Sequence, residues 1–250
     1  MADSIAGVVL AAGAGVRLRP LTRLRPKVLC PVGDRALVDH ALDRFAGVTA
    51  SIAVNVHHHR DMLESHLAGR VHLSIEEPVA LGTAGALGRL REWIDGRPVI
   101  ALNGDTYCPA TVQPLLDGWD GTRLRVFVVG AGPLRAGSVV AGSLLPWSEV
   151  VTFAPEPTGL YERSWGRAAQ DGRLEVVPLP ADAMCIDCGS PADYLAANLA
   201  WSGGESVIGR GALVEGTLDQ SVVWPGAPVR AGEHLVHAIR ANDRVTVLVR

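Results

Sequence analysis

The stretch from Leu10 to Gly33, LAAGAGVRLRPLTRLRPKVLCPVG, places a small-residue turn directly before a dense set of basic side chains. Five Arg or Lys residues fall between Arg17 and Lys27, in a chain whose formal net charge is -3. Glycines let backbone N–H groups close on an anion, and Arg and Lys neutralise its charge. The stretch therefore predicts a loop that binds a polyphosphate.

Three familiar types of binding segment do not fit this loop. Gly13 and Gly15 begin the dinucleotide pattern GxGxxG, but Leu18 stands at the third glycine position. A P-loop is excluded because no Gly-Lys-Ser/Thr follows. A nucleic-acid arm is disfavoured because Leu21 and Leu24 interleave the cations and no aromatic side chain is available for base stacking.

The elements that must position the loop alternate between strand and helix. Apolar runs predict buried strands at 5–10, 52–56, 71–75 and 99–102, and helical spacing predicts helices at 37–45, 61–67 and 84–94. This alternation indicates parallel strands with helices on both faces of the sheet. Ligands of such sheets gather at the carboxyl ends of the strands, where the glycine-rich loop and Asp105 both lie.

The second half of the chain continues the pattern less regularly. We expect strands at 124–129, 174–177 and 184–187, and helices at 111–119, 160–169 and 192–201. Pro191 suits the first turn of the last helix, because its missing N–H does no harm there. The segment 130–142 has no clear pattern. The predicted fold is α/β and Rossmann-like, a mostly parallel sheet with flanking helices.

The sequence pattern changes at Ser206, where glycines separate short runs of apolar residues. Val223, Val229 and Leu235 are six residues apart, which is the period of a left-handed β-helix whose aliphatic side chains point inward. About two coils fit the segment, and the alternative is an irregular glycine-rich β tail. We therefore expect a main domain over 1–204 and a short β-helix-like tail over 205–250.

Composition narrows the classes of protein that the chain can represent. Its 250 residues, 48% of them hydrophobic, suit one large α/β domain with a small appendage. A pI near 6.2 argues against a nucleic-acid or membrane-surface partner. No apolar run reaches the ~18 residues that a membrane helix requires. The N-terminus lacks a basic signal-peptide region and the four cysteines are scattered, so we expect a cytoplasmic protein.

The opening loop resembles the motif of the sugar-1-phosphate nucleotidylyltransferases, LAAGxGTRLxPLTxxxPKxLxPV. From Leu10 to Val32 the match is broken only at Val16, where the motif has Thr. Further similar segments follow in the family's order: LGTAG at 81–85, NGD at 103–105, and IDCGSPADYLAAN at 186–198, which is similar to DxGTPxDYLxAN. VNVHHH at 54–59 is most similar to mannose-1-phosphate guanylyltransferases and muramyl-phosphate uridylyltransferases.

The resemblance implies a glycosyltransferase-A-like fold and an enzyme that joins a nucleoside triphosphate to a sugar 1-phosphate and releases pyrophosphate. The resemblance leaves the nucleobase and the sugar open, and GTP with mannose 1-phosphate or a related hexose or heptose phosphate is one candidate pair. Arg17 would hold the β- and γ-phosphates, Lys27 would bridge phosphates near the reacting centre, and Asp105 and Asp187 would bind Mg²⁺. The implied nucleotide-binding residues are Leu10, Ala11, Ala12, Gly13, Ala14, Gly15, Gly82, Thr83, Asn103 and Gly104. The tail would mediate homo-oligomer contacts.

The sugar side departs from the family pattern. Most members carry a Glu-Lys-Pro segment whose Lys grips the sugar phosphate, whereas this chain has Pro155-Glu156-Pro157. Gly142 is similar to the family's sugar-contacting glycine, so Gly142 and Glu156 are the implied sugar-binding residues, and Ser190 replaces a Thr. The alternative to an active enzyme is a non-catalytic homologue that binds a nucleotide or nucleotide sugar and regulates a partner.

Two further groups have side chains that ligate metals elsewhere. His57, His58 and His59 follow a strand, and neighbouring residues rarely share one metal face. Cys185 and Cys188 form a CxxC, but the chain has no second pair. We expect neither group to bind a metal.

Overall fold

The computed structural model describes residues 4–130, 134, 138–180 and 182–249. Contacts between Cα atoms divide the chain into two compact units. The first unit comprises residues 1–13, 40–104 and 108–185, and the second comprises 14–39, 105–107 and 186–250. Each unit is therefore assembled from segments that are far apart in sequence.

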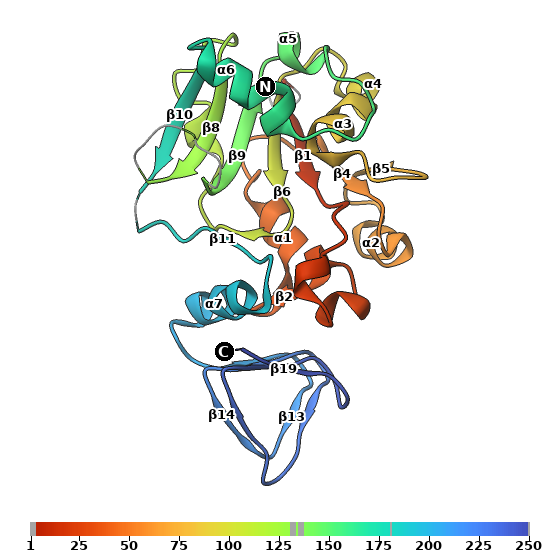
Figure 1. Ribbon diagram of the computed structural model, residues 1–250, viewed down its shortest axis with the longest axis vertical. Coiled ribbons are helices and arrows are strands. Elements are labelled where there is room, and N and C mark those ends of the chain that lie inside the picture. The colour runs from red at the N-terminus through yellow and green to blue at the C-terminus, as the bar shows by residue number, and fades with distance from the viewer. Residues whose placement is uncertain (1–3, 131–133, 135–137, 181, 250) are drawn as a thin grey trace. The chain divides into compact units, whose positions relative to one another are not determined.

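A seven-stranded sheet forms the centre of the first unit (Figure 1). Its spatial order is β10 (Leu174–Leu179), β8 (Leu124–Val129), β9 (Val140–Leu145), β6 (Val99–Asn103), β1 (Ala6–Leu10), β4 (Ile52–Val56) and β5 (His72–Ile75). Every neighbouring pair is parallel except those of β9, which runs antiparallel to β6 and β8. The prediction of a mostly parallel sheet is confirmed, and β9 is a strand that the sequence pattern missed.

The helices that accompany this sheet are short. They are α1 (Leu37–Asp43), α2 (Arg60–Leu67), α3 (Gly82–Arg89), α4 (Arg91–Ile94), α5 (Trp147–Val150) and α6 (Gly166–Gln170), with a π-helical turn at Tyr161–Trp165 before α6. The helix predicted at 111–119 is wrong, because only a 3-10 turn forms at Gln113–Leu115. Pro114 cannot donate a helical hydrogen bond, and Gly118 adopts a positive φ of 64°.

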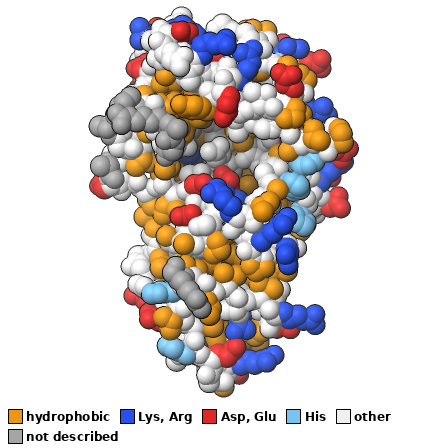
Figure 2. Space-filling view, in the orientation of Figure 1, with side chains coloured by type: hydrophobic (Ala, Val, Ile, Leu, Met, Phe, Trp, Pro, Cys, Tyr) orange, Lys and Arg blue, Asp and Glu red, His pale blue; other side chains and the backbone are white. Residues whose placement is uncertain are grey.

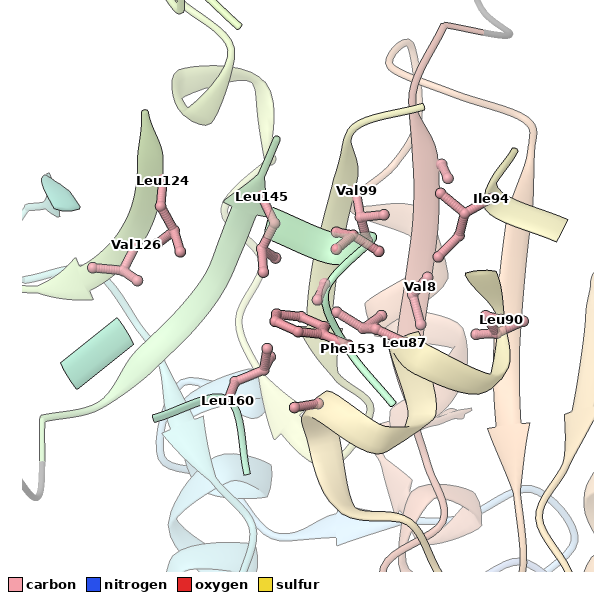
Figure 3. Packing of buried hydrophobic residues seen from close by; sticks show 14 of the residues in the cluster. Val8, Leu87, Leu90, Ile94, Val99, Leu124, Val126, Leu145, Phe153 and Leu160 are labelled. Atoms are coloured by element: carbon pink, nitrogen blue, oxygen red, sulfur yellow. The ribbon is translucent and has the colours of Figure 1, made fainter. Parts of the chain in front are cut away.

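The core of the first unit is aliphatic, as the composition suggests. Leu87 and Leu90 of α3 and its C-cap, with Ile94 of α4, belong to the same buried cluster as Val8 of β1 and Val99 of β6 (Figure 3). Phe153 and Leu160 belong to the same cluster. Burial of these side chains fixes the sheet, and with it the carboxyl ends of β1 and β6.

The second unit begins with the polyphosphate-loop candidate, which folds as three 3-10 turns, η1 (Val16–Leu18), η2 (Leu21–Arg23) and η3 (Lys27–Leu29). The hairpin β2 (Pro31–Val32) and β3 (Arg35–Ala36), the pair β7 (Thr106–Tyr107) and β11 (Ile186–Asp187), and helix α7 (Pro191–Ser202) complete its first part. Leu18 and Leu21 are fully buried. These apolar anchors hold the loop while the side chains of Arg17, Arg19 and Arg23 stay exposed.

The last segment of the second unit coils through three short parallel ladders (Figure 1). They are β12 (Val207–Ile208), β15 (Val222–Val223) and β18 (Ala238–Arg240); β13 (Leu213–Val214) and β16 (Pro228–Val229); and β14 (Thr217–Asp219) and β17 (His234–Val236), with β19 (Thr246–Leu248) antiparallel to β18. The predicted inward residues Val223, Val229 and Leu235 are buried. The left hand of the coil stays a prediction.

The distribution of charged side chains on the surface agrees with the small formal net charge of -3. On the face drawn in Figure 2, acidic and basic side chains are interspersed. In the described ranges, no helix has the length and apolar character that a membrane crossing needs.

Replacing Leu87 with Ala should lower the free energy of unfolding by about 2–5 kcal/mol, because the fully buried side chain leaves a cavity in the core. Urea denaturation measures this loss. The same change at Leu248, which is 63% exposed, is the control and should cost well under half as much. Equal losses at the two positions would contradict the packing described for α3.

Candidate active site

Lys27 lies between two carboxylates in the second unit. Its Nζ is 2.7 Å from Oδ2 of Asp105 and 3.0 Å from Oδ1 of Asp187. Arg17 adds a looser contact, with Nη2 3.6 Å from Oδ2 of Asp187. The structure thus brings together the two expected catalytic cations and the two expected metal carboxylates.

The two carboxylates meet because their strands pair. Asp187 of β11 lies opposite Thr106 of β7 in an antiparallel ladder, and the N–H of Cys188 donates to the carbonyl of Asp105 at 3.0 Å. Two positions more than eighty residues apart are therefore fixed by backbone hydrogen bonds. This geometry leaves the side chains free to bind a cation.

Lys27 differs from the other basic residues of the loop in its burial. Its side chain is 8% exposed, whereas that of Arg17 is 75% exposed. Burial by itself would lower the pKa of Lys27, but the charges and hydrogen bonds of Asp105 and Asp187 outweigh it, so the pKa lies above 10.5. Lys27 is also the only lysine among the 250 residues. It is a permanent cation at neutral pH.

The remaining cations of the loop have other surroundings. The guanidinium of Arg25 lies over the indole of Trp224, 4.5 Å from the ring centroid, which is a cation–π contact. Arg19 and Arg23 are exposed. The loop itself closes at Gly15, where φ is 59° and Thr22 donates its hydroxyl to the Gly15 carbonyl at 2.8 Å. Only Arg17 and Lys27 of the five cations contact the carboxylates.

Helix α7 holds the segment that follows Lys27. Tyr194, which is fully buried, donates its hydroxyl to the carbonyl of Pro31 and accepts a bond from Trp224 Nε1 at 2.9 Å. Asn198 accepts from the N–H of Gly33 at 3.0 Å. The Tyr and Asn of the DYLAAN segment are therefore positioning residues for the loop, a role that the sequence did not reveal.

Two small residues, Gly189 and Ser190, lie in the turn before α7, and each has a structural role there. Ser190 is the N-cap, and its Oγ accepts from the N–H of Asp193 at 3.2 Å, so it serves as a Thr would. A Cβ on Gly189 would lie 2.7 Å from Nη2 of Arg17. Glycine at this position lets Arg17 approach Asp187.

In the first unit, the expected nucleotide-binding residues gather at strand ends. Leu10 of β1 lies opposite Asn103 of β6, and the N–H of Gly104 donates to the Leu10 carbonyl at 2.9 Å. Leu10, Thr83, Asn103 and Gly142 line one small cavity. Three of the residues expected to bind the nucleotide therefore line the same cavity as Gly142, which is expected to contact the sugar.

A chain of buried hydrogen bonds connects the two loops of this unit that are expected to bind the nucleotide, at Ala11 and at Leu81. Asn55 accepts a bond from the N–H of Ala11 at 2.6 Å and donates to Oε1 of Glu76 at 2.8 Å, and Oε2 of Glu76 accepts from the N–H of Leu81 at 2.7 Å. Asn55 is 3% exposed and Glu76 is fully buried. Sequence reasoning missed both residues. An Asn inside the otherwise apolar run IAVNV was the available signal.

The glycines of α3 form a stripe against the chain from 154 to 158. A Cβ on Gly82 would lie 2.7 Å from the carbonyl oxygen of Thr158, one on Gly88 would lie 2.5 Å from that of Ala154, and one on Gly85 would overlap the carbonyl of Glu156. Thr83 also accepts a bond from the N–H of Leu160 at 2.7 Å. These contacts give Gly82 and Thr83 a packing role, and they place Glu156 with its backbone on α3 and its side chain exposed.

Gly142, in β9, is likewise closely packed. A Cβ there would lie 2.6 Å from Cδ2 of Leu102. Its lack of a side chain lets β9 approach β6 where the small cavity forms. Gly13 is different, because a Cβ on it would meet open space. A loop that binds a ligand through its backbone needs open space of this kind beside it.

The candidate metal residues supply hard oxygen ligands. Among the described residues, no group of three or more His, Cys, Asp or Glu side chains gathers as a metal site. Mg²⁺ commonly takes only one or two carboxylates, with phosphate oxygens and water as the other ligands. Asp105 and Asp187 both reach one ammonium, so they fit a shared divalent cation. His57 instead bonds the Glu76 carbonyl through Nδ1 at 2.8 Å.

Replacing Asn55 with Leu should destabilise the protein, because it leaves the N–H of Ala11 and the buried Glu76 carboxylate without their partner. The expected cost is about 1–3 kcal/mol for each group, measured by urea denaturation. Asn242→Leu removes an Asn that accepts two backbone bonds at an exposed turn, and it should cost less. A loss at Asn55 no greater than at Asn242 would show that the buried chain does not stabilise the loops.

Replacing Lys27 with Met should destabilise the protein by an amount that depends on pH. The folded-state pKa of Lys27 is raised, so its stabilising contribution is complete below pH 10.5 and is lost as the pH rises through the folded pKa. The stability gap between wild type and variant should be constant from pH 6 to about 10 and narrow above it. Urea titrations at several pH values measure the gap, with Arg210→Met as an exposed control. A gap that is unchanged at pH 11 would refute the pairing.

Comparison with known proteins identifies a family. The family model described as nucleotidyl transferase matches residues 6–129. N-acetylmuramate alpha-1-phosphate uridylyltransferase of Caulobacter vibrioides is 31% identical over 229 residues, covering 76% of this chain and 94% of that protein. The catalytic subunit beta of mannose-1-phosphate guanylyltransferase from Dictyostelium discoideum is 27% identical, covering 75% of this chain and 62% of that protein.

A crystal structure of a proposed glucose-1-phosphate thymidylyltransferase from Bacillus anthracis shares the fold. Its TM-score is 0.65 at 17% identity, covering 78% of this chain and 94% of that one. The sequence relatives, the fold, and the pairing of the loop lysine with two carboxylates lead to the same assignment. The chain belongs to the nucleotidyl transferase family.

Proposed function

We propose that the protein transfers a nucleotidyl group from a nucleoside triphosphate to a sugar 1-phosphate and releases pyrophosphate. The observation that carries this proposal is the convergence of Lys27, Asp105 and Asp187. A site that both neutralises phosphates and offers two carboxylates to a metal suits phosphoryl transfer better than it suits simple nucleotide binding.

The reaction needs positioning and charge stabilisation rather than a covalent intermediate. An oxygen of the sugar phosphate attacks the α-phosphorus in line, and the bond from that phosphorus to the pyrophosphate oxygen breaks. Lys27 holds phosphate oxygens near the reacting phosphorus. Arg17, whose side chain is mostly exposed and bonded only loosely to Asp187, holds the β- and γ-phosphates. Both cations stabilise the charge that develops on the leaving group.

Asp105 and Asp187 are the residues that would hold Mg²⁺. The ion would supply a Lewis acid at the phosphate oxygens. In the structure, Lys27 bonds both carboxylates and keeps their charges balanced. With Asp105 and Asp187 engaged in holding the ion, Lys27 would contact the substrate phosphates instead of the two carboxylates.

The nucleotide is proposed to bind along the turn from Leu10 to Gly15, where backbone N–H groups face the phosphates. Gly82 and Thr83 would line the base, and Asn103 and Gly104 would contact the nucleoside. The similar proteins from Caulobacter and Dictyostelium are named for uridylyl and guanylyl transfer, so UTP and GTP are the triphosphates to compare. Gly142 and Glu156 are proposed on the sugar side. Because Lys27 is the only lysine, any second side-chain cation for the sugar phosphate must be Arg or His.

Residues 1–204 are proposed as the nucleotidyltransferase domain and 205–250 as a left-handed β-helical tail. The tail carries exposed apolar side chains, among them Ile208, Leu213 and Leu248. Exposed aliphatic groups on a short coil suit contacts with a second copy of the chain.

Lys27→Ala and Asp187→Ala should each lower turnover by about 10²–10³-fold, because each removes charge stabilisation from the reacting phosphates. The measurement is pyrophosphate release from UTP or GTP, each paired with N-acetylmuramate 1-phosphate or mannose 1-phosphate. Arg244→Ala, on an exposed turn, is the control and should retain wild-type turnover.

Two results would contradict the proposed function. Wild-type protein that binds nucleotide by calorimetry but releases no pyrophosphate with any pair would instead indicate a regulatory binding protein. Turnover retained in both Lys27→Ala and Asp187→Ala would remove these residues from the mechanism.

A further inference from the structure

Two cysteines adjoin the short ladder of β7 and β11, Cys108 directly after β7 and Cys185 directly before β11. In that ladder Ile186 lies opposite Tyr107, so the next pair in the same register is Cys185 and Cys108. The bond from the N–H of Cys188 to the carbonyl of Asp105 marks a hydrogen-bonded pair, and hydrogen-bonded pairs alternate with non-hydrogen-bonded ones. One step beyond the end of the ladder, the continued register would therefore place Cys108 opposite Cys185 as a non-hydrogen-bonded pair. Cα atoms at such pairs are ~4.5 Å apart, within the range that a disulfide spans.

The two thiols are in contact within the first unit. Cys108 shares a hydrogen bond with Cys185, and both residues are thiols in the structure. Cys108 is 1% exposed, whereas Cys185 is partly exposed. A small reagent can therefore reach one thiol of the pair, and that thiol is already beside its partner.

A buried arginine provides positive charge at the pair. Arg44 is 3% exposed, and it donates from Nε to the Ala110 carbonyl at 2.8 Å and from Nη1 to the Ala141 carbonyl at 2.6 Å. Its buried Nη2 has no hydrogen-bond partner among the described residues. The Arg44 charge acts on both Cys108 and Cys185. An unpartnered cationic donor next to two thiols suits a thiolate.

The acidity of Cys108 agrees with this arrangement. The hydrogen bond with Cys185 lowers the pKa of Cys108 to about 6; burial opposes this shift, and the Arg44 charge and a backbone bond from Ala110 add to it. A thiolate is the nucleophile in disulfide exchange. The other two cysteines differ, because burial raises the pKa of Cys30 and of Cys188 to about 12.

We propose that Cys108 and Cys185 form a redox-active dithiol that low-molecular-weight disulfides convert into a reversible intrachain disulfide. Cys185 passes its proton to the Cys108 thiolate through their shared hydrogen bond and attacks one sulfur of the small disulfide. This attack forms a mixed disulfide and expels one small thiolate, which takes the proton back from Cys108. The Cys108 thiolate then attacks Sγ of Cys185, forms the Cys108–Cys185 bond and expels the second small thiolate. Two electrons pass from the protein to the reagent, and the two protein protons end on the two released thiols.

The disulfide joins the chain just after β7 to the chain just before β11. Asp187 lies two residues beyond Cys185, and Asp105 lies three residues before Cys108. Oxidation would therefore fix the backbone next to both candidate metal carboxylates. That consequence rests on the proposed function, whereas the dithiol itself does not.

The test is to treat the native full-length protein with oxidised glutathione, block remaining thiols with N-ethylmaleimide, and map disulfides by mass spectrometry. We expect a cross-linked peptide pair containing Cys108 and Cys185, two hydrogens lighter than the separate thiol peptides. Dithiothreitol should abolish it. The double variant C30S/C188S should give the same cross-link, and C108S should stop at a glutathione adduct on Cys185.

Disulfide mapping of the wild-type protein is sufficient to test the proposal without any variant. Recovery of Cys108 and Cys185 only as separate alkylated peptides would overturn it. A bond between Cys185 and Cys188, the CxxC pair, would overturn it as well. Neither result would bear on nucleotidyl transfer, which the pyrophosphate assay measures with reduced protein.

Discussion

The ammonium of Lys27, held between Asp105 and Asp187, is the interaction on which the second unit depends. It joins three segments that are distant in sequence. Two carboxylates so close together would repel each other, and burying an unpaired cation would cost free energy of desolvation. The attraction between Lys27 and the two aspartates offsets both costs. Any ligand that draws Lys27 away must bring positive charge to the carboxylates. A nucleotide that arrives with a divalent cation meets this requirement.

Polar networks stabilise the loops around the chemistry in each unit. In the second unit Tyr194 and Asn198 bond the chain that follows Lys27, and in the first unit Asn55 and Glu76 bond the loops at Ala11 and Leu81. Buried networks of this kind rigidify a structure only if every member has its partner. The loops are therefore positioned by side chains that never need to touch a substrate.

The sequence predicted the sheet well where each strand was a short apolar run followed by a helical pattern. It failed at β9, because the glycine in VVAGSLL weakens the strand signal, although the same glycine lets β9 pack closely on Leu102. The helix expected at 111–119 failed because Pro114 and Gly118 interrupt it. The LGTAG segment at 81–85 resembles a nucleotide-binding loop, yet Gly82 and Gly85, together with Gly88, also pack α3 on the segment from 154 to 158.

By itself the sequence predicted which residues carry the chemistry, because a dense motif from Leu10 to Val32 and two aspartate segments resemble those of a nucleotidyl transferase family. It could not determine that the loop lysine bonds both aspartates, or which cations are structural. Those facts depend on the pairing of β7 with β11 and on burial, which are set by contacts between residues far apart in the chain. Only the tertiary structure brings Lys27 inside and leaves Arg17 at the surface.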